Sequence, residues 1–79
     1  METNEIISKM ETIFQDILDN EDIKLSESTT AADVEDWDSL NHIQLVVGIE
    51  KSFKIKFTTQ EINAWNKVGD IAASIKAKL

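Results

Sequence analysis

Apolar residues recur every three or four positions in three separate stretches of the chain, and this spacing limits the possible folds most. Side chains so spaced share one face of an α-helix, so each stretch predicts an amphipathic helix that buries this face. The first stretch, with Thr3 or Asn4 as its expected cap, contains Ile6, Ile7, Met10, Ile13, Phe14, Ile17 and Leu18. The second runs from Ser39 to about Phe53. The third, expected to be capped by Asn66, contains Val68, Ile71, Ala72, Ile75 and Leu79.

The remaining segments provide no pair of strands. Residues 53–57 alternate between apolar and polar, but no second strand could pair with them, so they are expected to form an extended connector. Residues 58–61 match a capping box and predict a short helix that ends near Ala64. The sequence therefore predicts an all-α fold, a small four-helix bundle with a short third helix, in a single domain of residues 1–79. The core is expected to include Phe14, Leu45, Ile49, Phe53 and Ile71.

Residues 20–38 form a long connection between the first two long helices. Serine, threonine and acidic residues dominate it, and a helical turn over residues 30–34 is possible. A loop of this length inside a small domain is usually functional. Trp37 is expected to anchor the loop, because a large aromatic side chain can fix a segment on a small core.

The charge distribution restricts the partners. The net charge is −7, with twelve acidic residues and two lysines before Ser39, and three acidic residues and six lysines from Ser39 onward. This disfavours nucleic acid and anionic membranes, and favours basic partner proteins. The N-terminus is acidic rather than signal-like, and no apolar run reaches the ~20 residues of a membrane span, so a cytoplasmic monomer is expected.

No metal site is expected. The chain contains no cysteine, which excludes a cysteine-based metal site. The loop acids Asp33, Glu35, Asp36 and Asp38 lack the glycine and the distant glutamate of an EF-hand loop, so a solvated loop is the favoured interpretation.

Two apolar stripes lie on opposite sides of the helix after Ser39. One contains Leu45, Val46, Ile49 and Phe53, and the other contains Leu40, Ile43 and Val47. Either the helix is central and both stripes are buried, or the second is an exposed docking face beside Ser39, flanked by Asp36 and Gln44. Gly48 could allow close helix packing, or it could leave space inside the bundle for a bound hydrocarbon chain.

Catalysis is not expected. Ser39 and His42 lie three positions apart on a helix, so a nucleophile–base pair is conceivable. However, no aspartate that would orient His42 and no oxyanion site can be identified. No catalytic residue is therefore assigned, and His42 is expected to border the core.

With Asp38-Ser39-Leu40 at the junction between an acidic loop and a two-faced helix, the chain resembles an acyl carrier protein over nearly its whole length. The resemblance implies that Ser39, with Asp38 and Leu40 as motif neighbours, receives a 4'-phosphopantetheine arm from coenzyme A by the action of a phosphopantetheinyl transferase. The arm would hold acyl groups as thioesters for acyl-loading and acyl-processing enzymes of fatty-acid or polyketide-type biosynthesis.

The sequence departs from the fatty-acid carriers at several positions. Trp37 directly precedes Asp38-Ser39-Leu40, while Asn41, Gln44 and Lys51 reduce the acidity of the following helix. These departures favour a specialised carrier over the general fatty-acid carrier. A peptidyl or aminoacyl carrier of a nonribosomal-type pathway is an alternative. A helical adaptor without a covalent group is another, but it would make Asp38-Ser39-Leu40 a coincidence.

Overall fold

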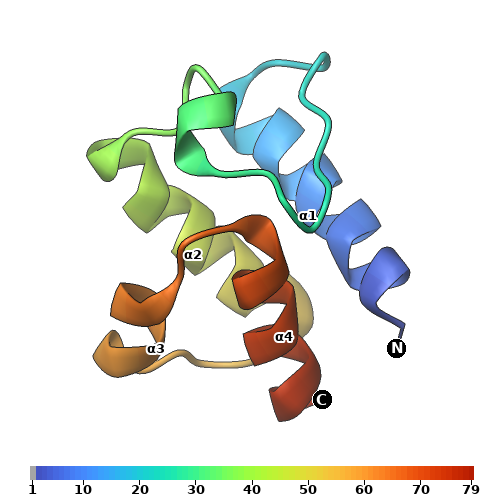
Figure 1. Ribbon diagram of the computed structural model, residues 1–79, viewed down its shortest axis with the longest axis vertical. Helices are drawn as coiled ribbons and strands as arrows, with labels where there is room; N and C mark the ends of the chain where they lie inside the picture. The colour runs from blue at the N-terminus through green and yellow to red at the C-terminus, as the bar shows by residue number, and fades with distance from the viewer. Residues whose placement is uncertain (1) are drawn as a thin grey trace.

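Each of the three amphipathic stretches forms a long helix, and the capping-box segment forms the short one. The computed structural model describes residues 2–79, and no strand occurs among them (Figure 1). The elements are α1 (Thr3–Leu18), the 3-10 turn η1 (Ala31–Asp33), α2 (Ser39–Phe53), α3 (Thr59–Ala64) and α4 (Val68–Lys78). The predicted all-α fold, with its long loop and short third helix, is confirmed.

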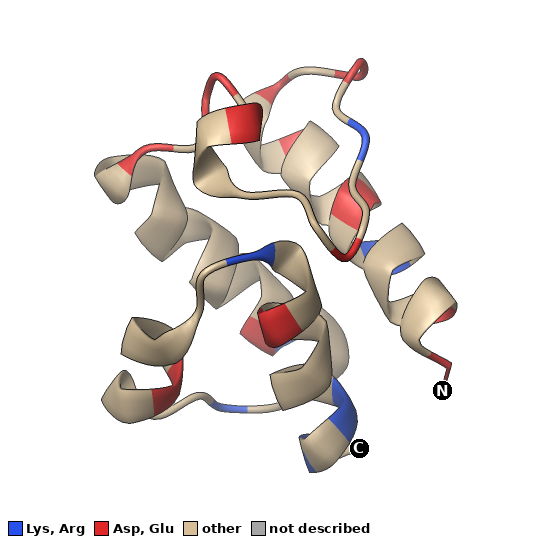
Figure 2. Cartoon of the chain, viewed as in Figure 1, with Lys and Arg blue, Asp and Glu red and all other residues tan. Residues whose placement is uncertain are grey.

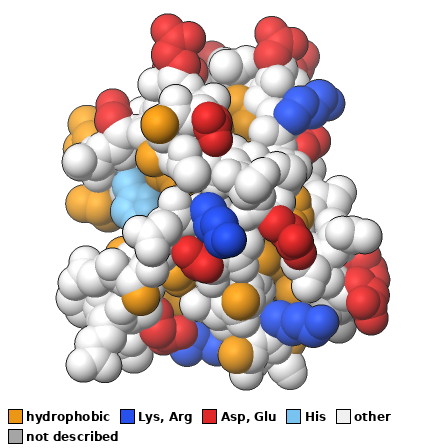
Figure 3. Space-filling model, in the orientation of Figure 1, with side chains coloured by type: hydrophobic (Ala, Val, Ile, Leu, Met, Phe, Trp, Pro, Cys, Tyr) orange, Lys and Arg blue, Asp and Glu red, His pale blue; other side chains and the backbone are white. Residues whose placement is uncertain are grey.

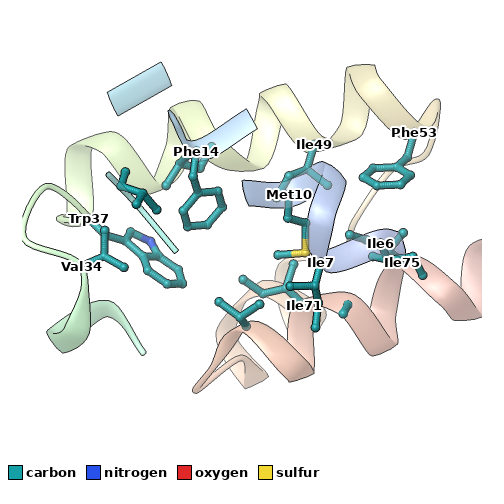
Figure 4. Close-up of a cluster of buried hydrophobic side chains, with 14 residues drawn as sticks. Ile6, Ile7, Met10, Phe14, Val34, Trp37, Ile49, Phe53, Ile71 and Ile75 are labelled. Carbon is teal, nitrogen blue, oxygen red and sulfur yellow. The ribbon is translucent and has the colours of Figure 1, made fainter. Parts of the chain in front are cut away.

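The core lies where α1 meets α2 and α4 (Figure 4). All five residues expected in the core are buried. The largest fully buried side chains are Ile6, Met10, Phe14, Leu45, Ile49, Val68, Ile71 and Ile75. The connector after α2 also turns inward, since Ile55 and Phe57 pack against this core. The apolar faces predicted from helical spacing therefore meet in one cluster.

Gly48 lets α1 and α2 approach closely. A Cβ at this position would lie 2.5 Å from Cδ1 of Ile17 and 3.2 Å from Cγ2 of Ile13. Real Cβ atoms essentially never show the shorter of these distances. Side chains of α1 thus fill the space beside Gly48, which agrees with the close helix packing expected of this glycine.

Three details of the helix ends differ from expectation. The N-cap of α1 is Glu2, whose N–H donates to Oε1 of Glu5 at 3.5 Å, so the expectation of Thr3 or Asn4 was wrong. The N-cap of α4 is Lys67 rather than Asn66. The N–H of Asn66 instead donates to Oδ2 of Asp70 at 2.9 Å. Leu79 is 55% exposed and lies beyond the apolar stripe of α4. The expected caps of α1 and α4 thus lie within about two residues of the observed ones.

The long loop is fixed to α1 by side chains of that helix. Nε2 of Gln15 donates to the carbonyl of Ile23 at 2.9 Å, and Oε2 of Glu11 accepts from the N–H of Leu25 at 3.0 Å. These two bonds satisfy backbone groups that an irregular segment would otherwise leave unpaired. The first half of the loop therefore has a defined path over α1.

The second half of the loop is bonded to the start of α4. The N–H of Val68 donates to the carbonyl of Thr29 at 2.8 Å, and the N–H of Gly69 donates to the carbonyl of Glu27 at 2.9 Å. A Cβ on Gly69 would lie only 2.9 Å from the Glu27 carbonyl oxygen, so glycine permits this approach. These bonds hold the loop at a defined position before it leads into α2.

Acidic and basic residues separate along the molecule. Nearly all charged residues of the loop between α1 and α2 are acidic, while lysines appear on the connection after α2 and at the end of α4 (Figure 2). This arrangement in space follows the division of charge in the sequence at Ser39. Among residues 2–79, no helix is both long and apolar enough to cross a membrane.

Candidate functional site

Ser39 is the first residue of α2, and Asp38 fixes where the helix begins. Oδ1 of Asp38 accepts from the N–H of Asn41 at 2.8 Å, which is the geometry of an N-cap. Nδ2 of Asn41 in turn donates to the carbonyl of Asp36 at 2.9 Å. These bonds hold the end of the acidic loop against the first turn, and the Ser39 side chain is exposed there.

The first turn of α2 can accommodate a negatively charged group on Ser39. The N–H groups of Ser39 and Leu40 have no acceptor among residues 2–79, because Asp38 caps only the N–H groups of Asn41 and His42. Free N–H groups and the helix dipole favour an anion at a helix start. A phosphodiester on the exposed hydroxyl of Ser39 fits this environment.

Trp37 anchors the loop immediately before the helix. Its side chain is buried, and its ring meets the ring of Phe14 edge-on at a centroid distance of 5.0 Å. Nε1 of Trp37 donates to Nδ1 of His42 at 2.9 Å. The expected role of Trp37 as a loop anchor is confirmed, and the hydrogen bond to His42 adds a link that the sequence did not indicate.

His42 is not arranged as a base for Ser39. Its Nδ1 accepts the Trp37 hydrogen bond, and no hydrogen bond joins its ring to the Ser39 hydroxyl among residues 2–79. The side chain is half-buried, as expected for a residue that borders the core, and this burial lowers its pKa below the ordinary value of 6.5. The neutral form is therefore favoured, which also keeps Nδ1 available as an acceptor.

This arrangement predicts a loss of stability at mildly acidic pH. Because the pKa of His42 is lower in the folded state, the unfolded chain binds the proton more readily once the pH falls below about 6.5. The stability contributed by neutral His42 is thus present above that pH and is lost as the pH falls through the folded-state pKa. We expect urea midpoints of the wild type to decline between about pH 7.5 and pH 5.5.

His42→Gln is the matched variant for this test. The glutamine oxygen can accept from Trp37 but does not titrate, so the decline over this pH range should become shallower. Circular dichroism at both pH values for both proteins measures the difference. Equal declines in wild type and His42→Gln would assign the pH dependence to the carboxylates instead.

A cleft opens beside Ser39, between the start of α2 and the connection from α3 to α4. Its volume is about 440 Å³. Its lining residues are Ala31, Trp37, Asp38, Ser39, His42, Trp65, Asn66, Lys67 and Ile71. In the space-filling view, the single histidine appears at the surface next to hydrophobic side chains (Figure 3). The cleft gives a group attached to Ser39 a partly apolar surface to lie against.

Trp65 and Lys67 are cleft residues to which the sequence assigned no role in the site. Nε1 of Trp65 donates to Oγ of Ser74 at 2.9 Å, and its ring meets Phe57 edge-on at 4.7 Å. Lys67 is the cleft's lysine. Both lie more than twenty positions after Ser39, so only the folded chain brings them to it.

The second apolar stripe of α2 is exposed. Leu40 is 71% exposed, Ile43 65% and Val47 42%, whereas the opposite stripe is buried. The alternative in which both stripes are buried is therefore excluded. Asp36 and Gln44, the expected flanking residues, are exposed as well. Three exposed large apolar residues next to Ser39 form a surface suited to contact with another protein.

The carboxylates of the acidic loop lie apart from one another in the structure. Within residues 2–79, no three side chains of histidine, aspartate or glutamate converge where they could hold a metal ion. Asp33 instead accepts hydrogen bonds from the N–H of Thr30 at 3.0 Å and from its hydroxyl at 3.2 Å. That carboxylate therefore helps to shape the turn η1.

The chain is similar to acyl carrier proteins in sequence and structure. It is 31% identical over 75 residues to an acyl carrier protein of Thermotoga maritima, covering 95% of this chain and 93% of that protein. It is 28% identical over 78 residues to one of Borreliella burgdorferi (strain ZS7), covering 99% and 98%. No protein-family model matches it. The solution structure of a holo acyl carrier protein from Geobacter metallireducens superimposes with a TM-score of 0.87 at 36% identity, covering 92% of this chain and 84% of that one.

Proposed function

The chain belongs to the acyl carrier protein family, and on this premise we propose that Ser39 is the residue to which its phosphopantetheine group is attached. The protein carries acyl groups as thioesters on that group, whose thiol supplies the reactive atom. The observation that supports Ser39 is its position. It is exposed at the first residue of α2, next to two free N–H groups and an open cleft.

Other serines offer less suitable surroundings. The hydroxyls of Ser26 and Ser28 lie 3.2 Å apart in a turn, and the hydroxyl of Ser74 is engaged by Trp65. Ser52 is exposed, but it lies at the C-terminal end of α2, where the helix dipole disfavours an anion. Ser39 alone among these combines exposure with a helix N-terminus.

The proposed partner surface consists of Leu40, Ile43 and Val47, with Asp36 and Gln44 at its border. A phosphopantetheinyl transferase must approach this side of α2 to reach Ser39, and so must the enzymes that load and process the acyl group. The carrier itself contributes no catalytic residue to these reactions. It acts as a monomer in the cytoplasm, where coenzyme A is at hand.

The proposed pathway is a specialised fatty-acid or polyketide-type synthesis. Asn41 and Gln44 are uncharged at the exposed start of α2, which separates this surface from the acidic helix of the general fatty-acid carriers. A peptidyl or aminoacyl cargo would use the same serine, so the activating enzyme decides between these cargoes.

Intact-mass measurement tests the proposed attachment. Incubation with coenzyme A and a broad-specificity phosphopantetheinyl transferase should add one phosphopantetheine to the wild-type chain, and peptide mapping should locate it at Ser39. Subsequent loading should give an acyl adduct that hydroxylamine removes, as expected of a thioester. An unmodified chain, or an arm mapped to another residue, would contradict the proposal.

A smaller effect is expected at the partner surface. Val47→Ala removes two methyl groups from an exposed site, so folding should change little, while acyl loading by the cognate enzyme should slow by about fivefold in kcat/KM. Ser52→Ala, on the same helix, is the matched control and should load at the wild-type rate. Equal rates for Val47→Ala and wild type would remove Val47 from the docking surface.

A further inference from the structure

The exposed charges along the second half of α2 and just after it are lysines. Glu50 is the one acidic residue of α2, and it is half-buried, with Oε2 accepting from the N–H of Phe57 at 2.8 Å. This bond directs the Glu50 carboxylate toward the connector after the helix. Lys51, Lys54 and Lys56, in contrast, are all exposed. This end of α2 therefore presents positive charge to a partner, although the net charge of the whole chain is −7.

These lysines surround a surface groove of about 510 Å³, here called the basic groove. It is lined by Val47, Glu50, Lys51, Lys54, Ile55 and Lys56. Val47 belongs both to the groove and to the exposed apolar surface, and Lys51 follows it by one helical turn. Lys54 ends the helix in a left-handed conformation, with φ of 58°, and turns the chain so that Ile55 packs inward. Apolar surface and lysines are thus continuous.

Two of the five lysines outside the basic groove, Lys9 and Lys78, have intramolecular contacts of a kind that the lysines of the basic groove lack. Nζ of Lys78 pairs with Oε1 of Glu61 at 2.9 Å, which lowers the pKa of Glu61. Nζ of Lys9 lies 5.7 Å from the centroid of the Phe53 ring. Among residues 2–79, no ion pair or aromatic contact of this kind involves the lysines of the basic groove.

We propose that the basic groove docks a carboxylate-bearing surface of the enzymes that load or process the cargo. This inference rests on the proposed function, because those enzymes must approach α2 to reach Ser39. Leu40, Ile43 and Val47 provide the apolar contact, and the lysines select a partner whose corresponding rim carries aspartate or glutamate. Complementary charge of this kind contributes mainly to partner choice and to the rate of association.

The two ends of α2 together would fix the orientation of the partner. Asp36 and Asp38 make the Ser39 end negative, while the basic groove makes the other end positive, about 20 Å away at 1.5 Å per residue. A partner with cations opposite the first end and carboxylates opposite the second fits in one direction only. In the reverse direction like charges would face each other, which costs affinity.

Charge favours a protein partner over the other candidate occupants. An anionic membrane would attract the lysines but repel the acidic loop at the other end of the same helix. A second copy could place its acidic loop in the groove, but the same loop is needed at Ser39 for the transferase. Each of these occupants is an outcome of the test.

The probe is a pair of helical peptides with identical leucine stripes, one flanked by four glutamates and the other by four lysines. Each is titrated into the ¹⁵N-labelled holo protein. The glutamate peptide should shift the amide resonances of Val47, Lys51 and Ile55, and the lysine peptide should bind at least about tenfold more weakly. Equal binding of the two peptides, or shifts confined to other parts of the chain, would overturn the proposal.

A charge-reversal pair provides the control. Lys51→Glu with Lys56→Glu should weaken binding of the glutamate peptide by about tenfold, since two attractions become repulsions. Lys54 is left unchanged because of its left-handed backbone. Lys24→Glu with Lys76→Glu changes the net charge equally outside the groove and should leave binding within about twofold of wild type. Equal losses in both pairs would attribute the binding to net charge alone.

Two further measurements address the competing occupants. The first is binding to vesicles that contain anionic phospholipids. If wild type binds these vesicles more tightly than it binds the glutamate peptide, and the Lys51→Glu/Lys56→Glu variant does not bind them, the groove is a membrane contact instead. The second is sedimentation at several protein concentrations. If wild type dimerises and the Lys51→Glu/Lys56→Glu variant does not, the groove is a contact between two copies of this chain instead. Phosphopantetheine transfer to Ser39 is measured on the apo form of each variant, before the holo samples are prepared. If the Lys51→Glu/Lys56→Glu variant accepts phosphopantetheine normally and still binds the glutamate peptide as wild type does, the proposed docking role of the basic groove is wrong. The proposed carrier function would remain intact.

Discussion

Ser39→Ala should accept no phosphopantetheine and should therefore carry no acyl group. The hydroxyl oxygen is the atom that would form the phosphodiester bond, so its removal should eliminate the modification instead of slowing it. Intact mass after incubation with coenzyme A and the transferase should equal that of the starting chain. No other single substitution is expected to affect function as strongly.

Folding should survive this change. The cap of α2 is the Asp38 carboxylate, which Ser39→Ala leaves in place, and alanine is well tolerated inside a helix. The far-ultraviolet circular dichroism spectrum should match that of wild type. Ser52→Ala, which removes an exposed serine from the other end of α2, should be modified normally. An arm on Ser39→Ala would mean that another hydroxyl receives it.

Ile49→Ala should produce the largest loss of stability. Ile49 is 1% exposed and faces the core from the second half of α2, so truncation removes buried apolar contacts and leaves a cavity. Such changes cost about 2–5 kcal/mol. A domain of this size is typically stable by only about 5–15 kcal/mol. The midpoint of thermal unfolding should fall by about 10 °C or more.

Ile43→Ala is the matched control, because it makes the same chemical change six residues earlier, on the exposed stripe of α2. Ile43 is 65% exposed, and its truncation should change the free energy of unfolding by no more than about 0.5 kcal/mol. Urea titration of both variants measures the contrast. Similar losses for both variants would mean that the two faces of α2 are equally buried in solution.

The helices could be predicted because the information that defines them is local. Helical spacing placed Phe14, Ile49 and Ile71 on buried faces, and the structure confirms all three. The exposure of the opposite stripe could not be predicted. A helix with two apolar faces fits either a central position or a peripheral one, and only the placement of α1 and α4 decides between them.

The contacts around Ser39 could not be derived from spacing either. Trp37 precedes the helix, so no periodicity relates its indole to His42 across the first turn. Trp65 and Lys67 reach the cleft because the connection between α3 and α4 lies beside the start of α2. The basic groove depends on the side-chain orientation of Glu50, which a hydrogen bond to the connector determines. Each of these features depends on tertiary packing.

The positions of the two tryptophans give the protein an optical reporter of its own. Trp37 and Trp65 are the chain's only indoles, and both line the cleft beside Ser39, with His42 between them at centroid distances of 6.0 and 6.2 Å. Their fluorescence therefore arises at the proposed site of attachment, with no contribution from an indole elsewhere in the chain. Emission intensity and wavelength should respond to a group entering the cleft and to the charge of the imidazole, so loading can be followed in real time without an added dye.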